Sequence, residues 1–160
     1  MRLQIAAIGR LKEGPERRLL ARYASLLDGL GRGSGLGPLT ITELPEARGA
    51  DVAKRTADEA ARLIKAASSS DVIVLLDERG RAMTSLALAQ SMREDRDGGV
   101  KSISFLIGGA DGHGEEARAA SQRQLSLSSL TLPHGLARIL LAEQLYRAVS
   151  IIAGHPYHRE

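Results

Sequence analysis

The last quarter of the chain, Leu125–Glu160, has the sequence LSLSSLTLPHGLARILLAEQLYRAVSIIAGHPYHRE. A Ser-rich apolar segment leads into a Thr-Leu-Pro-His turn, and the apolar positions that follow recur at helical spacing. A helix from Pro133 to Ala153 would be about 30 Å long. Gly154 suits the end of this helix, and Pro156 prevents its continuation. We therefore expect a strand, a long core helix and a short polar tail, in that order.

Upstream of this segment, apolar runs alternate with stretches of helical periodicity. Strands are expected at Leu3–Ile8, Leu39–Leu44, Asp71–Leu76, Val100–Ile107 and Gln124–Leu130. Helices are expected from Pro15, after Asp51, from Thr84 or Ser85, from Glu115 and from Pro133. This βαβαβαβαβα order predicts an α/β fold of three layers, in which helices cover both faces of a mainly parallel sheet.

The segment Gly29–Pro38, GLGRGSGLGP, has glycine at every second position from Gly29 to Gly37. A nucleotide-binding G-x-G-x-x-G loop needs glycines two and five positions after the first, and it follows a strand. Here all the glycines have odd numbers and follow an expected helix. We therefore expect Gly29 to end that helix and the segment to form a flexible surface connection.

The composition limits the size and chemistry of the protein. A chain of 160 residues is long enough for one domain with a substantial core. One Phe, three Tyr and no Trp argue against binding single-stranded nucleic acid through stacked bases. The absence of Cys excludes disulfides, thiolate metal sites and cysteine nucleophiles.

Charge and hydropathy bear on location and partners. The start of the chain has no signal-peptide pattern, and its apolar runs are shorter than the ~18 residues of a membrane span. We therefore expect a cytoplasmic protein without membrane contact. The net charge of +3 and the excess of Arg over Lys suit phosphate recognition, but they equally fit a solubilising surface or a GC-rich genome.

The expected topology indicates where a ligand would bind. Ligands of open parallel sheets lie beyond the carboxyl ends of the strands. In this chain those ends are Leu76–Asp77, Gly108–Gly109 and Leu130–Leu132. The two glycines have two open interpretations, because they can simply turn the chain or can admit a ligand close to the backbone.

Several common active-site patterns are missing, and a few polar residues stand out. The sequence contains no G-K-[ST] of a P-loop and no G-x-S-x-G elbow at a strand end. Glu143 and Arg147 are four residues apart, which favours a surface ion pair. Arg138 lies near the start of the last helix, where a cation gains nothing from the helix dipole, so an external phosphate is a candidate partner. The tail Tyr157-His158-Arg159 is otherwise typical of a frayed terminus.

Four motifs occur in order: GG-x-x-G after the fourth strand, LSLSSLTLPH, R-x-L-L-x-E-Q-L-Y-R-A and the terminal HPYHRE. Together they resemble the ribosomal RNA large subunit methyltransferase H family of the SPOUT superfamily, over the whole chain. The resemblance implies a single SPOUT domain at residues 1–160 with a C-terminal trefoil knot, and a homodimer. It also implies methylation of N3 of a pseudouridine in the helix 69 loop of 23S rRNA, on the assembled ribosome, with S-adenosylmethionine as cofactor and without a metal.

The resemblance also implies site residues. The cofactor contacts would be Leu76, Gly108, Leu127, Ser128, Ser129, Leu130, Thr131 and Leu132. The catalytic group would be the tail, with His158 as base or proton relay and Arg159 and Tyr157 positioning the nucleotide. Arg138 and Arg159 would contact RNA, or Arg138 the partner subunit.

Two features depart from the family pattern: the glycine content of Gly29–Pro38, and His113 where the family commonly has an apolar residue. Two alternative functions stay open at this point. The same fold could methylate another rRNA or a tRNA position, or the protein could bind ribosomes without catalysis. The second alternative predicts that S-adenosylmethionine does not bind.

Overall fold

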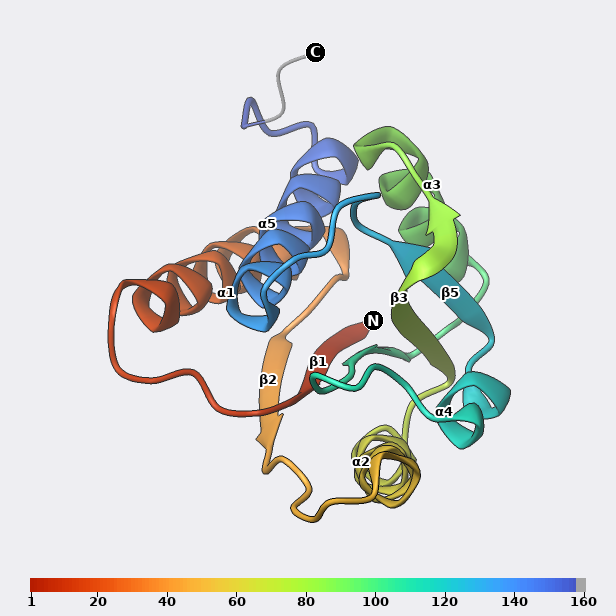
Figure 1. Ribbon diagram of the computed structural model, residues 1–160. Helices are drawn as coiled ribbons and strands as arrows, with labels where there is room; N and C mark the ends of the chain where they lie inside the picture. The colour runs from red at the N-terminus through yellow and green to blue at the C-terminus, as the bar shows by residue number, and fades with distance from the viewer. Residues whose placement is uncertain (158–160) are drawn as a thin grey trace.

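The computed structural model describes residues 1–157 (Figure 1). The strands are β1 (Arg2–Ile8), β2 (Leu39–Leu44), β3 (Val72–Ala82), β4 (Ser102–Ile107) and β5 (Arg123–Ser126). The helices are α1 (Pro15–Ser34), α2 (Val52–Ala66), α3 (Ser85–Asp97), α4 (Glu115–Ala120) and α5 (His134–Ile152). The element order is the predicted one. None of these helices is both long and apolar enough to cross a membrane.

The strands form one sheet in the order β2-β1-β4-β3-β5, and all neighbouring strands are parallel. The central strand β4, SISFLI, is buried at every position. Such a continuous apolar strand is typical of a parallel sheet whose two faces are both covered. The predicted mainly parallel α/β architecture is confirmed, whereas the trefoil knot stays a prediction.

Two hydrophobic cores lie on opposite faces of the sheet. On one face α1, α3 and α5 pack against β1 and β4, through residues that include Leu27, Met92, Leu145 and Phe105. On the other face Leu63 of α2 and Ala117 of α4 belong to a smaller core. Figure 1 shows these two groups of helices on either side of the sheet, and so the three predicted layers are present.

The prediction for Gly29–Pro38 is wrong, because α1 continues through Gly29, Gly31 and Gly33 to Ser34. A Cβ at Gly31 would lie 2.1 Å from the carbonyl oxygen of Leu36, which shows that the chain folds back directly onto the helix there. Gly35 has φ of 69° and donates its N–H to Gly31. The packing of buried Leu27 and Leu36 therefore outweighs the helix propensity cost of about 1 kcal/mol per glycine.

The strands β3 and β5 also differ from the predicted ranges. β3 extends past Leu76 to Ala82, and Leu125 of β5 is paired with both Leu76 and Arg81. Residues 77–80, predicted as a loop, therefore form an irregularity within the strand. β5 ends at Ser126, four residues before the predicted end at Leu130, so residues 127–132 are free of the sheet ladder.

Candidate functional site

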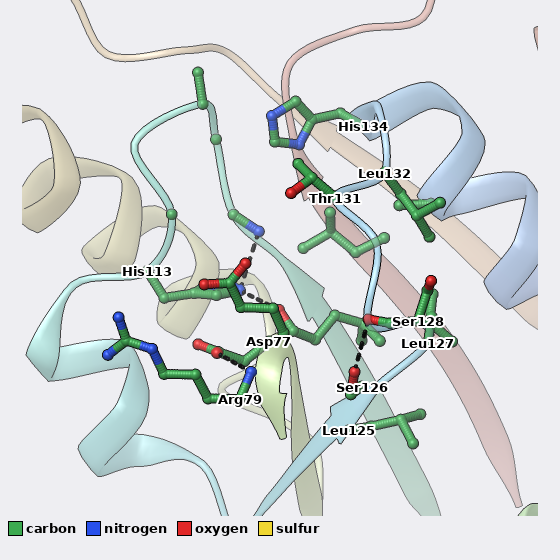
Figure 2. Close-up of a pocket in the computed structure, with 18 of the residues that line it drawn as sticks. Asp77, Arg79, His113, Leu125, Ser126, Leu127, Ser128, Thr131, Leu132 and His134 are labelled. Carbon is green, nitrogen blue, oxygen red and sulfur yellow. Dashed lines mark hydrogen bonds between the residues drawn. The ribbon is translucent and has the colours of Figure 1, made fainter. Parts of the chain in front are cut away.

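A pocket of about 450 Å³ lies at the carboxyl ends of β3, β4 and β5 (Figure 2). Parallel strands place these ends at one edge of the sheet, and three segments line the pocket there. They are residues 76–79 after the buried half of β3, residues 107–113 after β4, and most of residues 125–134 after β5. The start of α5 closes the pocket through His134 and Ala137.

The structure brings most of the predicted cofactor-binding residues together. Those that line the pocket are Leu76, Gly108, Leu127, Ser128, Leu130, Thr131 and Leu132. Ser129 is the one member of the predicted set outside the lining. The role of these residues in binding a cofactor stays a prediction, but their convergence follows from the topology of the sheet.

Serine hydroxyls shape the segment after β5. Ser126 Oγ donates a hydrogen bond to the carbonyl of Ser128 at 3.0 Å, and Leu130 N–H donates to Ser128 Oγ at 2.9 Å. These local bonds replace the sheet ladder that ends at Ser126. The turn leaves Leu130 75% exposed beside the pocket, where its side chain is available to a ligand.

The glycines after β4 are required by close packing. A Cβ at Gly109 would lie 2.4 Å from Glu59 Oε2 of α2. A Cβ at Gly108 would lie 2.8 Å from the carbonyl oxygen of Gly112. The geometry thus supports the interpretation that these two glycines let the chain turn and pack closely. Close ligand approach remains compatible with it, since both glycines also border the pocket.

His113 is a pocket residue that was not assigned to the site from the sequence. Its Nε2 lies 2.8 Å from the carbonyl oxygen of Leu76 and 3.2 Å from the backbone nitrogen of Gly108. Its Nδ1 is buried and has no hydrogen-bond partner among residues 1–157. Burial, which disfavours the charged imidazolium, lowers the pKa of His113 below its ordinary value. The only signal in the sequence was its departure from the family pattern.

Charged side chains surround the mouth of the pocket. Asp77 forms an ion pair with Arg118 of α4 and accepts a hydrogen bond from Arg79 N–H at 2.9 Å. Burial opposes ionisation of Asp77, but these hydrogen bonds outweigh it and hold the pKa of the carboxyl below its ordinary value. Asp77 is therefore a carboxylate at neutral pH, and its negative charge is paired with the guanidinium of Arg118.

Arg138 is 2% exposed and lies inside the protein. Its Nη1 is 3.0 Å from Glu43 Oε1, and its Nη2 donates to the carbonyl of Ile8. Burial lowers the pKa of Arg138, and the nearby carboxylate of Glu43 opposes this shift. Because the guanidinium ties α5 to the ends of β1 and β2, the geometry argues against the predicted contact of Arg138 with RNA phosphate or a partner subunit.

The tail does not enter the pocket of its own chain as far as it is described. The Tyr157 ring lies 4.5 Å from the Tyr146 ring, centroid to centroid, and its hydroxyl donates to Glu143 Oε1 at 3.0 Å. Partial burial and the contact with Glu143 raise the pKa of Tyr157. His158 and Arg159, the other two predicted catalytic residues, lie outside the described residues.

The predicted pair of Glu143 and Arg147 is confirmed, with Arg147 Nη2 2.7 Å from Glu143 Oε1. The pair is less exposed than expected, since the Glu143 side chain is only 14% exposed. Arg147 also lies over the Tyr157 ring, 5.0 Å from its centroid. The hydrogen bond of Tyr157 to Glu143 and its cation–π contact with Arg147 thus hold the described part of the tail against α5.

Comparisons with known proteins agree with this architecture. A family model described as "Predicted SPOUT methyltransferase" matches residues 1–158. Proteins named ribosomal RNA large subunit methyltransferase H from Methylobacterium sp. (strain 4-46) and Bradyrhizobium sp. (strain ORS 278) are 45% and 46% identical to the chain. In both cases the match covers 99% of this chain and 98% of the relative.

Solved structures share the fold at low sequence identity. A probable methylase family protein from Haemophilus influenzae Rd KW20 matches 99% of this chain and 70% of its own, with a TM-score of 0.55 and 10% identity. A putative methylase family protein from Neisseria gonorrhoeae matches 91% of this chain and 80% of its own, with a TM-score of 0.50 and 15% identity. The family match over nearly the whole length, together with the close relatives, establishes that the chain belongs to the SPOUT methyltransferase family.

Proposed function

We propose that this protein transfers a methyl group from S-adenosylmethionine to N3 of a pseudouridine in 23S rRNA on the assembled ribosome, in the cytoplasm. The convergence of three strand ends on one pocket carries the proposal, because the segment 127–132 lies there beside Leu76 and Gly108. The names of the close relatives support large-subunit rRNA as the substrate.

The pocket has the size and lining that the cofactor needs. Its volume of about 450 Å³ lies within the range of small-molecule sites, about 300–1,000 Å³. The leucines at 76, 127, 130 and 132 offer apolar surface to an adenine ring, and the backbone offers hydrogen-bonding groups. Asp77 and Arg79 also line the pocket and would offer charges of opposite sign to the zwitterionic amino-acid part of such a ligand. When bound, the cofactor supplies an electrophilic methyl group on a sulfonium.

The RNA side of the reaction calls for a different group. N3–H of a uracil ring is weakly acidic, and a base within hydrogen-bonding distance assists its removal. In the proposed reaction His158 takes this proton, and Arg159 and Tyr157 hold the nucleotide. The pocket aligns the methyl group with N3 for in-line attack.

The proposed enzyme is a homodimer in which the tail of one copy completes the pocket of the other. Tyr157 contacts Tyr146, which lies nine residues beyond the pocket residue Ala137, about 14 Å along a helix. Tyr157 therefore lies away from the pocket of its own chain. Exchange of tails between two copies brings the catalytic group to the cofactor. We also propose that residues 1–160 form a single SPOUT domain with a C-terminal trefoil knot.

Transfer of labelled methyl from S-adenosylmethionine to whole ribosomes and to naked rRNA, followed by mapping of the modified base, tests the proposal. We expect labelling of one 23S rRNA pseudouridine at N3, and stronger labelling of ribosomes than of naked rRNA. Label in tRNA or at another rRNA position would assign a different substrate. No label, together with no cofactor binding in calorimetry, would leave a non-catalytic ribosome-binding protein.

A further inference from the structure

The contact of His113 with two strand ends cannot satisfy all the groups involved. Nε2 lies near both an acceptor, the carbonyl of Leu76, and a donor, the N–H of Gly108. A single imidazole nitrogen is either a donor or an acceptor in a given tautomer. One of the two backbone groups is therefore without a proper bond to His113, whichever tautomer is present.

The other ring nitrogen adds to this mismatch. Nδ1 of His113 is buried and lacks a hydrogen-bond partner in the described part of the chain. In one tautomer it is an unsatisfied acceptor, and in the other it is an unsatisfied donor. Buried polar groups without partners are costly, so the ring occupies its place at a free-energy penalty. Figure 2 shows the ring reaching the strand ends, with a dashed line to each of the two backbone groups.

A flat ring with a donor next to an acceptor would satisfy both backbone groups at once. The edge of adenine has this pattern, since its exocyclic amino group donates and an adjacent ring nitrogen accepts. The amino group would pair with the carbonyl of Leu76 and the ring nitrogen with the N–H of Gly108. His113 holds the same two groups with one atom and satisfies only one of them.

We propose that His113 is an affinity-determining residue of the cofactor pocket. Its imidazole contacts the Leu76 carbonyl and the Gly108 N–H, and it has to leave both groups before the edge of a nucleobase can pair with them. This inference rests on the proposed cofactor site. The adenine part of the cofactor and the imidazole of His113 then compete for the same two backbone groups, and this competition lowers the affinity of the pocket for adenine. Residue 113 therefore weakens binding of nucleobases without touching the amino-acid end of the ligand.

Calorimetry on the dimeric protein with S-adenosylmethionine, adenosine and methionine as separate probes tests this role. We expect His113→Leu to bind S-adenosylmethionine and adenosine about 5- to 10-fold more tightly, because one competing hydrogen bond of ordinary net strength is removed. Binding of methionine should not change, and it serves as the internal control. Equal or weaker binding of adenosine by the variant would overturn the inference.

The unaltered protein offers a second measurement that does not depend on the variant. The titratable and charged groups that face the imidazole are Asp77 of β3, Arg118 of α4 and His134 of α5. Burial now lowers the pKa of His113, so displacement of the ring by adenosine, which carries no charge, should move its NMR titration midpoint upward. An unchanged or lower midpoint at saturation would contradict displacement. Absence of cofactor binding by both proteins would contradict the proposed function as well.

Discussion

The two ends of α5 have different surroundings. At its start, His134 and Ala137 border a pocket that is built from three strand ends. In its second half, Glu143 and Tyr146 hold Tyr157 of the tail against the helix. The strand ends and the start of α5 that line the pocket all belong to one chain, whereas the described part of the tail lies beside the second half of α5 and not beside the pocket.

The two ends of α5 therefore correspond to two different proposed functions, cofactor binding and proton removal, although both lie in the C-terminal segment Leu125–Glu160. In the proposed reaction, binding of the cofactor would depend on the pocket end, and removal of the N3 proton would depend on the tail. In the proposed dimer, changes at one end should therefore affect one step and spare the other. Substitutions at the two ends of α5 test whether the two functions are separate.

The largest effect is expected at the tail. His158→Ala should lower methyl transfer to ribosomes by about 10²- to 10⁴-fold, since a positioned general base contributes about that much. The affinity for S-adenosylmethionine, measured by calorimetry, should stay within about twofold of the original. If the folded dimer keeps full turnover, His158 is not the base.

The next effect concerns the anchor at the start of α5. Arg138→Met removes the buried cation that bonds to Glu43 and to the carbonyl of Ile8, whereas Glu43 keeps its bonds to Arg17 and to Leu11 N–H. We expect the free energy of unfolding to fall by about 2 kcal/mol, as for the loss of a hydrogen bond to a charged group. Denaturant unfolding at a fixed protein concentration measures this change. Arg62→Met breaks the more exposed pair with Asp58 and should cost less than about 1 kcal/mol. If Arg138→Met is as stable as the original protein but binds RNA more weakly, Arg138 contacts RNA phosphate after all.

A smaller effect is expected from a charge placed in the pocket. Leu130→Arg puts a guanidinium where an exposed leucine borders the pocket, and it should weaken S-adenosylmethionine binding by about 10-fold, or about 1.4 kcal/mol. Leu86→Arg is the matched control, because Leu86 is 53% exposed and lies outside the pocket lining. Equal losses in the two variants would argue against the proposed pocket.

The smallest effect concerns the contact of the tail with α5. The pKa of Tyr157 is raised, so its neutral phenol stabilises the folded state fully below the ordinary tyrosine pKa near 10. This contribution should decline as the pH rises above 10. We expect Tyr157→Phe to lower the free energy of unfolding at pH 8 by about 1 kcal/mol and to reduce its loss between pH 9 and 11. Identical pH profiles of the two proteins would exclude this coupling.

Local patterns in the sequence were sufficient for most elements and for the position of the pocket. The alternation of strands and helices follows from apolar spacing. Helix starts follow from side-chain caps, such as Asp51, whose carboxylate accepts from Ala53 and Lys54 N–H. The pocket position at Leu76, Gly108 and 130–132 then follows from parallel topology. The resemblance to the SPOUT family added the cofactor and the role of the tail.

Errors occurred where a partner distant in the sequence outweighs a local preference. Gly31 is a poor helix residue by itself, but it is the residue that allows Leu36 to fold back onto α1. Arg138 has no local carboxylate partner, and it pairs with Glu43, 95 positions earlier in the chain. His113 stands where the family commonly has an apolar residue, and its two contacts exist only because β3 and β4 lie side by side in the sheet.

The sequence alone determined the layered α/β fold and the edge of the sheet at which the pocket lies, because apolar periodicity acts over a few residues and parallel strands share one carboxyl edge. Only the tertiary structure decided that the glycine-rich segment is helical, that Arg138 is an internal anchor and that His113 occupies the strand ends. Each of these depends on the free energy of burying groups that the chain brings together from distant positions, which no local pattern contains.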